Sequence, residues 1–385
     1  MKETQVHKYN MLTSRDTPER AILVSANVGH KEYFDPEYLL EELRLLSNTA
    51  GAEVVATVIQ KKGSLTSRYL LSKGKFEELK SLAADTSAEI VIFDEELTPT
   101  QQSNISIELK CKVIDRTALI LDIFAMHAHT HEGRLQVELA QLNYLLPRLK
   151  GKGVALSRLG GGIGTRGPGE TKLEVDRRRI RQKVRALNRK IAALSIQRDV
   201  QRKKRKKQNI PEVSLVGYTN AGKSTILNAL TTAKVLVEDK LFSTLDPTTR
   251  RIRTPDGIMF LLSDTVGFIE KLPHLLIAAF KSTLDEVKES EVIIKVVDAS
   301  KSEFKRQLDA VMEVLDEIGC ADKKSIIAFN KIDLCDDNSM KRLKSLYPDA
   351  VLISAKNRIG LSDLVVRVEG TLSEEKLSSE YLSEY

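Results

Sequence analysis

The sequence lacks the features that mark several specialised classes of protein. Its 385 residues contain no run of about 18 apolar residues, so a membrane-spanning helix is not expected. The amino-terminal stretch lacks the apolar core of a secretory signal peptide. The three cysteines, Cys111, Cys320 and Cys335, are scattered without the spacing of a metal site, which argues against a disulfide framework and favours a reducing cytoplasm.

The net charge is small over most of the chain and large in one segment. Hydrophobic residues make up 42% and charged residues 29%, which is ordinary for a globular protein, and the length predicts two or three domains of roughly 150 residues each. Within the formal net charge of +7, residues 172–207 hold sixteen Lys or Arg and three acids, so this segment carries +13 and the rest −6. Such a segment is typical of a surface that binds nucleic acid, and less often of one that binds anionic membrane.

Residues 19–128 alternate between strand and helix patterns. Short apolar runs predict strands at 21–24, 53–59, 89–93 and 112–115, and helical spacing predicts helices at 38–46, 76–82 and 98–109. Strands that alternate with helices form a parallel sheet covered on both faces. This region contains no specific nucleotide-binding or catalytic motif.

Residues 132–207 have helical spacing that is interrupted by one glycine-rich loop. The apolar positions follow helical periods in two stripes, Leu135, Leu139, Leu142 and Leu146 on the first helix and Ile180, Val184, Leu187, Ile191 and Leu194 on the second. The loop between them, at 150–169, contains GGGIGTRGPG and cannot continue either helix. We therefore expect an antiparallel helical hairpin with a basic tip, whose second arm ends in the basic run 202–207.

A phosphate-binding motif lies near the start of a third region. Residues 217–224, GYTNAGKS, match the pattern G-x-x-x-x-G-K-[ST], between an apolar strand at 213–216 and a helix at 225–230. The backbone N–H groups of such a loop surround phosphate, Lys223 reaches the β- and γ-phosphates, and Ser224 binds Mg²⁺.

Three further elements follow in the order of a GTP-binding domain. Asp264 and Gly267 form a D-x-x-G motif behind an apolar strand, which supplies a second carboxylate near Mg²⁺ and a glycine N–H that can sense the γ-phosphate. Asp333, in the sequence NKID, can accept both N1–H and the exocyclic amine of guanine, whereas adenine would leave it unpaired at a cost of about 1–3 kcal/mol. The sequence SAK at 354–356 can offer a backbone N–H to guanine O6.

Three positions bear on how GTP would be hydrolysed. Thr244 is our first choice for the threonine that reaches Mg²⁺ when γ-phosphate is bound, and Thr248 is the second. Phe268 stands where many GTPases have a water-orienting glutamine, so we expect slow intrinsic hydrolysis that a partner or ion must accelerate. Asn220 stands where potassium-activated GTPases carry asparagine, and the alternative is that it only caps the loop.

These motifs, together with the glycine-rich loop, resemble the HflX-type ribosome-associated GTPases. The resemblance is carried by residues 132–149, 159–174 (LGGGIGTRGPGETKLE), 216–228, 241–251, 264–269 and 272–274 (LPH), and it covers residues 20 to about 370. It implies a GTPase that binds the large ribosomal subunit and directs its hairpin toward the peptidyl transferase region. It further implies that the protein splits ribosomes or rescues stalled ones under stress.

The predicted fold class is α/β, in four parts. These are an amino-terminal parallel α/β domain at 1–130, an antiparallel helical hairpin at 131–207, a Ras-like P-loop GTPase domain at 208–372 and a short tail at 373–385. The predicted catalytic residues are Lys223, Thr244 and Gly267, and the predicted Mg²⁺ ligands are Ser224, Thr244 and Asp264. The predicted nucleotide-binding residues are Gly217, Tyr218, Thr219, Asn220, Ala221, Gly222, Lys223, Ser224, Thr225, Asp264, Gly267, Asn330, Lys331, Asp333, Ser354, Ala355 and Lys356.

The predicted partners are GTP or GDP and the large ribosomal subunit. The predicted RNA contacts are Arg158, Gly162, Gly164, Arg166, Arg202, Lys203, Lys204, Arg205, Lys206 and Lys207. Mg²⁺ is the expected cofactor, with K⁺ bound through Asn220 as a further one. We expect a cytoplasmic monomer, while a peripheral site at the membrane surface and the choice between whole ribosomes and free large subunits stay open.

Four other interpretations compete with this one. Residues 162–167 match the dinucleotide fingerprint G-x-G-x-x-G, but no strand precedes them. His127, His129 and His131 alternate as metal ligands in a strand would, although the sequence there is passing into a helix. The chain could instead be a GTP-gated RNA-binding module that hydrolysis only resets, or an ATP-driven RNA remodeller whose amino-terminal domain binds a second nucleotide.

Overall fold

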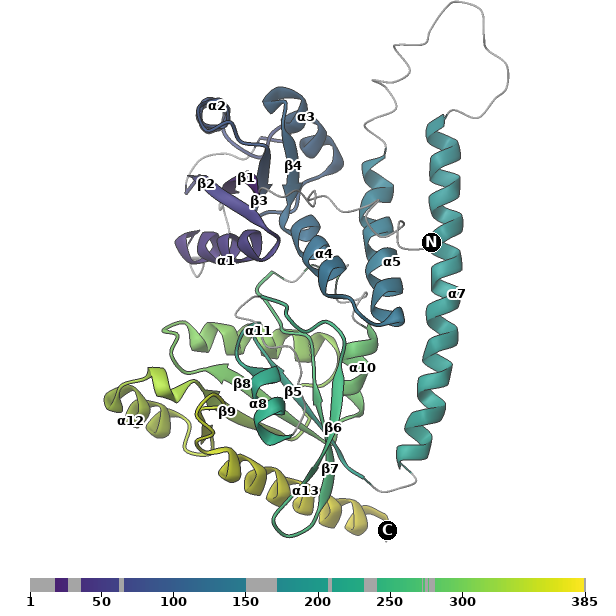
Figure 1. The fold of residues 1–385 in the computed structure, drawn as a ribbon, viewed down its shortest axis with the longest axis vertical. Helices are drawn as coiled ribbons and strands as arrows, with labels where there is room; N and C mark the ends of the chain where they lie inside the picture. The colour runs from purple at the N-terminus through teal and green to yellow at the C-terminus, as the bar shows by residue number, and fades with distance from the viewer. Residues whose placement is uncertain are drawn as a thin grey trace, which may run out of the picture. The chain divides into compact units, whose positions relative to one another are not determined.

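The structure is a computed structural model that divides into two compact units. It describes residues 18–26, 36–61, 66–149, 172–206, 210–231, 241–271, 273, 276 and 281–383. The amino-terminal unit comprises Met1–Met126 and Arg134–Ala192, and the carboxy-terminal unit comprises His127–Gly133 and Ala193–Tyr385 (Figure 1). Across these described ranges, no helix combines the length and the apolar character needed to cross a membrane.

The amino-terminal unit is built on a four-stranded sheet in which every strand is parallel to its neighbours. The strand order is β2-β1-β3-β4. The strands are β1 (Glu19–Ser25), β2 (Ala52–Ile59), β3 (Ile90–Phe93) and β4 (Lys112–Asp115). All residues of β3 are buried, as expected for a strand covered on both faces. The predicted parallel α/β arrangement is therefore confirmed.

Helices cover this sheet because the side chains of its strands point alternately to the two faces, so that apolar side chains on each face must be shielded from water. They are α1 (Pro36–Thr49), α2 (Lys73–Asp85), α3 (Pro99–Leu109) and α4 (Arg116–His127). Ile22, Val24 and Phe93 share one buried cluster with the apolar side chains of α2 and α3. Thr98 caps α3 in a capping box, because its side chain accepts from the Gln101 N–H while the Gln101 side chain accepts from the Thr98 N–H.

Two helices form the hairpin arms, α5 (His131–Arg148) and α7 (Lys172–Lys206). Lys183 of α7 pairs with Glu138 of α5, and Arg198 pairs with Glu132 at 2.7 Å. The later residue of α7 thus pairs with the earlier residue of α5, so the two arms are antiparallel, as predicted. The apolar stripe of α7 is its less exposed face, with Leu187 at its buried centre.

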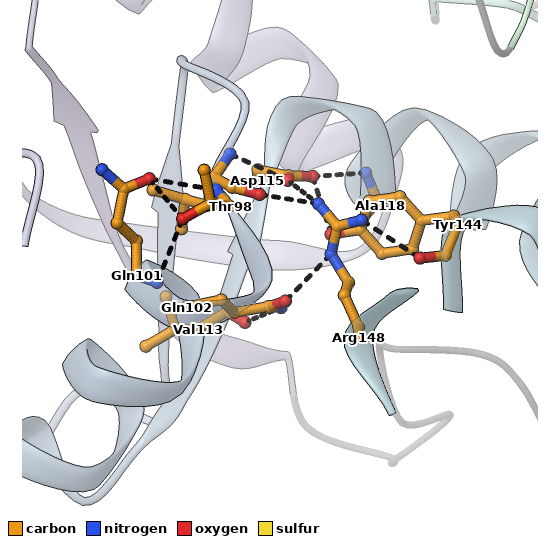
Figure 2. Close-up of polar contacts among 9 residues, drawn as sticks. Thr98, Gln101, Gln102, Val113, Asp115, Ala118, Tyr144 and Arg148 are labelled. Atoms are coloured by element: carbon orange, nitrogen blue, oxygen red, sulfur yellow. Dashed lines mark hydrogen bonds and ion pairs between the residues drawn. The ribbon is translucent and has the colours of Figure 1, made fainter. Parts of the chain in front are cut away.

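A cluster of polar contacts around Asp115 fastens the end of α5 to the sheet. Asp115 ends β4, is fully buried, and accepts from Tyr144 Oη at 2.9 Å and from an Arg148 nitrogen at 2.9 Å (Figure 2). The Arg148 guanidinium lies over the Tyr144 ring, 3.5 Å from its centre. Burial, and then the Asp115 charge, raise the pKa of Tyr144. Removing one partner of such a buried ion pair costs about 3–5 kcal/mol, so this cluster strongly constrains α5.

The carboxy-terminal unit contains a six-stranded sheet with the order β10-β9-β8-β5-β7-β6. Its strands are β5 (Glu212–Gly217), β6 (Thr248–Arg253), β7 (Met259–Asp264), β8 (Val292–Asp298), β9 (Ser325–Asn330) and β10 (Val351–Leu352). Only β6 runs antiparallel to its neighbour, β7. The carboxyl ends of the parallel strands therefore meet at one edge, which is where ligands bind in such sheets.

Helices pack on both faces of this second sheet. They are α8 (Lys223–Leu230), α10 (Lys281–Glu289), α11 (Phe304–Glu317), α12 (Asp337–Leu346) and α13 (Leu361–Ser383). Side chains of α8 and α13 share one apolar core with β5, β7 and β8. The segment expected as a short tail from residue 373 is the second half of α13, because the helical pattern that begins at Leu361 meets no glycine or proline stop after Gly370.

Candidate nucleotide-binding site

The phosphate-binding loop joins β5 to α8, and glycines shape it. Gly222 has a φ of +95°, and a Cβ there would collide with the Asn330 side chain. A Cβ on Gly267 would come within 2.6 Å of the Thr219 Cα. The predicted loop and the predicted D-x-x-G motif therefore lie in direct contact, at a distance that only glycine allows.

Lys223 lies inside this loop, with 5% of its surface exposed. Its Nζ donates to the carbonyl oxygens of Gly217 at 3.1 Å and of Tyr218 at 3.0 Å. Burial lowers the pKa of Lys223 to about 8, while the nearby Asp264 charge acts in the opposite direction. The cavity between this loop and the Thr244 segment has a volume of about 30 Å³, and Lys223 is one of the residues that line it.

Three oxygen-bearing side chains meet beside Lys223. Ser224 Oγ donates to Asp264 Oδ2 at 2.6 Å and lies 2.7 Å from Thr244 Oγ1. Asp264 is fully buried, and within the described part of the chain its Oδ1 has no hydrogen-bond partner. Burial raises the pKa of Asp264, and the Lys223 charge opposes that rise. Mg²⁺ prefers hard oxygen ligands, so this donor set, with one orphaned carboxylate oxygen, fits the ion.

The two threonine candidates lie in different settings. Thr244 is the one beside Ser224, whereas Thr248 begins β6 and is paired with Asp264 across the β6–β7 ladder. The arrangement favours Thr244 as the magnesium ligand, which stays a prediction.

Asn330 braces the loops around the site. At the end of β9, its Nδ2 donates to the Ala221 carbonyl at 2.9 Å and its Oδ1 accepts from the Ala355 N–H at 3.0 Å. The predicted base-contacting loop and the phosphate loop are thus held together by one buried amide. The Ala355 N–H is engaged by Asn330 here.

The acid predicted to read guanine lies next to that loop. Asp333, in the short 3₁₀ helix η2 (Ile332–Leu334), accepts from Ser354 Oγ at 2.5 Å. Lys331 has a left-handed backbone, with φ +65°, and pairs with Asp298 at 2.9 Å. Asp298, which ends β8, was missed by sequence reasoning, although an acid after a buried strand is a usable signal.

Phe268 contributes backbone rather than side chain to the site. Its ring is 1% exposed, and its backbone bridges that of Tyr218. The Thr219 N–H donates to the Phe268 carbonyl at 2.7 Å, and the Phe268 N–H donates to the Gly217 carbonyl at 3.0 Å. A buried phenyl ring offers no hydrogen bond to an attacking water, in keeping with the sequence interpretation.

A second residue missed by sequence reasoning supports the segment after Phe268. The Glu270 N–H donates to Tyr218 Oη at 2.9 Å, and the Glu270 carboxylate pairs with Arg306 of α11. These partners lie 36 to 52 residues apart in the sequence, so no local pattern connects them.

The histidine-rich segment offers no metal site in the described ranges. His127 ends α4 and His131 begins α5, and no group of three potential His, Cys, Asp or Glu ligands occurs among the residues that the structure describes. The predicted contacts Arg158, Gly162, Gly164, Arg166 and Lys207 lie outside the described residues. The basic positions 202–206 fall within α7.

Comparisons with known proteins identify the family. Three family models match in succession: "GTP-binding GTPase N-terminal" at residues 37–125, "GTP-binding GTPase Middle Region" at 127–205 and "50S ribosome-binding GTPase" at 212–331. GTPase HflX of Caldanaerobacter subterraneus subsp. tengcongensis is 49% identical over 367 residues, which are 95% of this chain and 84% of that relative. GTPase HflX of Escherichia coli K12 is 41% identical over 95% of this chain and 85% of that relative.

The chain belongs to the HflX family of GTPases. It is therefore an enzyme that binds guanine nucleotide and hydrolyses GTP. A crystal structure described as the SsGBP and GDP complex is similar to this HflX chain over 92% of its length and 99% of the solved chain, with 27% identity and a TM-score of 0.50. That solved structure is a complex with GDP.

The buried lysine of this HflX chain predicts a pH-dependent affinity for nucleotide. Phosphate oxygens bind the charged form of Lys223, whose pKa in the free protein is lowered to about 8. GDP affinity should therefore be level near pH 7 and fall about tenfold by about pH 9, since the lysine must then take up a proton on binding. Titration calorimetry in buffers of different ionisation enthalpy measures both the affinity and the proton uptake.

Uptake approaching one proton at about pH 9 is expected, against little uptake at about pH 7. A GDP affinity that stays level to about pH 9 without proton uptake would contradict a depressed lysine pKa.

Proposed function

We propose that this chain binds the large ribosomal subunit through its helical hairpin and splits or recycles stalled ribosomes under stress. The observation that carries the proposal is the strongly basic second arm, α7, which ends only a few residues before β5 of the phosphate-binding loop. The match to a model described as a 50S ribosome-binding GTPase supports the same partner. We further infer that the protein acts as a monomer in the cytoplasm.

The geometry of α7 suits contact with RNA. A helix of 35 residues is about 50 Å long, and it carries its apolar stripe on one side. Arg178, Arg181, Arg185 and Arg189 are exposed in the first part of that helix. A solvated helix needs no excess of thirteen positive charges, whereas a phosphate backbone attracts them.

The nucleotide would be held by residues that already lie together. Ser224, Thr244 and Asp264 would hold Mg²⁺, and the bound ion would neutralise charge on the β- and γ-phosphate oxygens. Lys223 would donate to the same oxygens, and the Gly267 N–H would contact the γ-phosphate. Asp333 would accept two hydrogens from guanine, which favours GTP over ATP by about 1–3 kcal/mol.

Potassium would complete the charge distribution around the phosphates. Asn220 has a left-handed backbone, with φ +60°, is exposed, and lines the cavity of the phosphate-binding loop. Its carbonyl would bind K⁺ where other GTPases place an arginine. GTP turnover should therefore be faster in K⁺ than in Na⁺ at equal ionic strength, and Asn220→Ala should remove the difference. Equal rates in the two salts would contradict this role.

The ribosome assignment predicts nucleotide-dependent association. The protein should sediment with purified large subunits in the presence of a non-hydrolysable GTP analogue and much less with GDP. Replacing Lys203, Lys204 and Arg205 by glutamine should weaken that association. It should also reduce the slope of log K against log salt by about two units, because fewer phosphates are neutralised and fewer counterions are released on binding. Affinity for GTP should not change.

A matched variant on α12 controls for net charge. Lys341, Arg342 and Lys344 are exposed, and their replacement by glutamine removes the same three charges. This control should leave ribosome association near that of the unmodified chain. Co-sedimentation that is the same with GDP and with the GTP analogue, or an equal loss of ribosome association in both variants, would contradict binding through the hairpin.

A further inference from the structure

A seven-residue segment connects the hairpin to the GTPase unit. His127–Gly133 belongs to the carboxy-terminal unit, although the chain on both sides of it belongs to the amino-terminal unit. Helix α5 begins within this segment, at His131. The start of α5 is thus fixed by contacts inside the GTPase unit.

Besides the ion pair between Glu132 of this segment and Arg198 of α7, the segment is contacted by the carboxylate of Asp246. Asp246 Oδ2 accepts from the N–H groups of His129 at 2.9 Å and Thr130 at 2.7 Å. Its Oδ1 accepts from Thr130 Oγ1 at 2.5 Å. A negative charge at the start of a helix is also favoured by the helix dipole.

Thr130 has two roles at once. Besides donating to Asp246, its Oγ1 accepts from the Gly133 N–H at 2.9 Å, which makes Thr130 the N-cap of α5. The capping hydroxyl therefore donates its hydrogen bond to Asp246 while its oxygen accepts the N–H of Gly133. The same hydroxyl group thus caps the first turn of α5 and holds the carboxylate of Asp246 in place.

Gly133 leaves space for this arrangement. A Cβ at Gly133 would collide with the Asp246 carboxylate. Gly133 has no positive φ, so its backbone conformation is open to alanine. The glycine is needed for the approach of Asp246 and not for the helix, where alanine would be favoured by about 1 kcal/mol.

Asp246 lies two residues after Thr244, whose Oγ1 is 2.7 Å from Ser224 Oγ. Leu245 between them is buried, with 3% exposure, so the short connection has little freedom. Two residues span at most about 7 Å of chain. A displacement of Thr244 is therefore passed directly to Asp246.

We propose that Asp246 is a positioning residue that couples the placement of Thr244 at the nucleotide site to the seating of the first turn of α5. The proposal rests on the role of Thr244 proposed above. With γ-phosphate and Mg²⁺ bound, Thr244 stays beside Ser224 and Asp246 stays on His129 and Thr130. With GDP, Thr244 is released and Asp246 leaves the start of α5.

The coupling acts in both directions, because a free energy shared by two sites is reciprocal. A partner that binds the hairpin and stabilises the contact of Asp246 with the start of α5 therefore also favours the position of Thr244 beside Ser224. The far end of α5 is held by Arg148 on Asp115 in the amino-terminal unit (Figure 2). The first turn of α5 is thus held within the carboxy-terminal unit, and its last turn is held within the amino-terminal unit.

The test compares nucleotide selectivity in four variants of the full chain. For Asp246→Asn, Thr130→Val, Gly133→Ala and the double variant Asp246→Asn/Thr130→Val, affinities for GDP and for a non-hydrolysable GTP analogue are measured with Mg²⁺. Each single variant should weaken analogue binding about fivefold to tenfold and leave GDP binding unchanged. The double variant should be no weaker than either single one, and Thr130→Ser should restore the selectivity.

Two features separate coupling from a general loss of structure. Asp256→Asn, the same change at an exposed acid of this unit, should behave as the unmodified chain. Gly133→Ala should raise the stability of α5 while lowering selectivity, which loss of folding cannot produce. In hydrogen exchange, the amides of His129 and Thr130 should be better protected with the analogue than with GDP, and Asp246→Asn should abolish that difference.

The outcomes distinguish this proposal from the one on which it rests. If the unmodified chain shows no Mg²⁺-dependent preference for the analogue, the role of Thr244 is wrong and the coupling falls with it. If the unmodified chain shows the preference and the variants keep it, or lose GDP and analogue binding equally, Asp246 is a structural residue only and the coupling is overturned.

Discussion

The burial of a carboxylate and an ammonium group in one small site is the constraint on which the rest of the structure depends. Asp264 and Lys223 are both almost inaccessible to water, and such charges are costly unless neighbours satisfy them. Ser224 and two backbone carbonyls supply part of that satisfaction. The remaining oxygen of Asp264 fits Mg²⁺, so the site is built to be completed by a nucleotide and its ion.

The surrounding elements keep this site closely packed. Gly222 and Gly267 allow the loops to approach, and Asn330 ties the phosphate loop to the loop after β10. The same packing places the Thr244 loop against the start of α5. Asp246, two residues after Thr244, contacts His129 and Thr130, which directly precede α5.

Much of this could be predicted from the sequence, because the relevant signals are local. The strands β1 to β5 and β7 and the helices α1, α2, α3, α5, α7 and α8 follow from short periodic patterns, and the P-loop, D-x-x-G and NKID motifs each lie within a few residues, whereas β6, β8 and the helices α10 to α13 were not predicted one by one. Helix α4 was not predicted, because nine of its twelve residues are buried and it shows no polar face. The contact between Thr130 and Asp246 spans 116 residues, so it depends on the fold and leaves no local signal. The amide of Asn330 also braces two loops that are distant in the sequence, and its predicted contact with the nucleotide stays a prediction.

The proposed response to nucleotide depends most on Thr244, which we propose is a Mg²⁺ ligand only when the γ-phosphate is bound. The most direct measurement is the gain in affinity for a non-hydrolysable GTP analogue that Mg²⁺ produces, compared between Thr244→Val and Thr248→Val. The arrangement around Ser224 predicts that Thr244→Val loses this gain and Thr248→Val retains it. A gain that survives in Thr244→Val, or one that is lost only in Thr248→Val, would contradict the account.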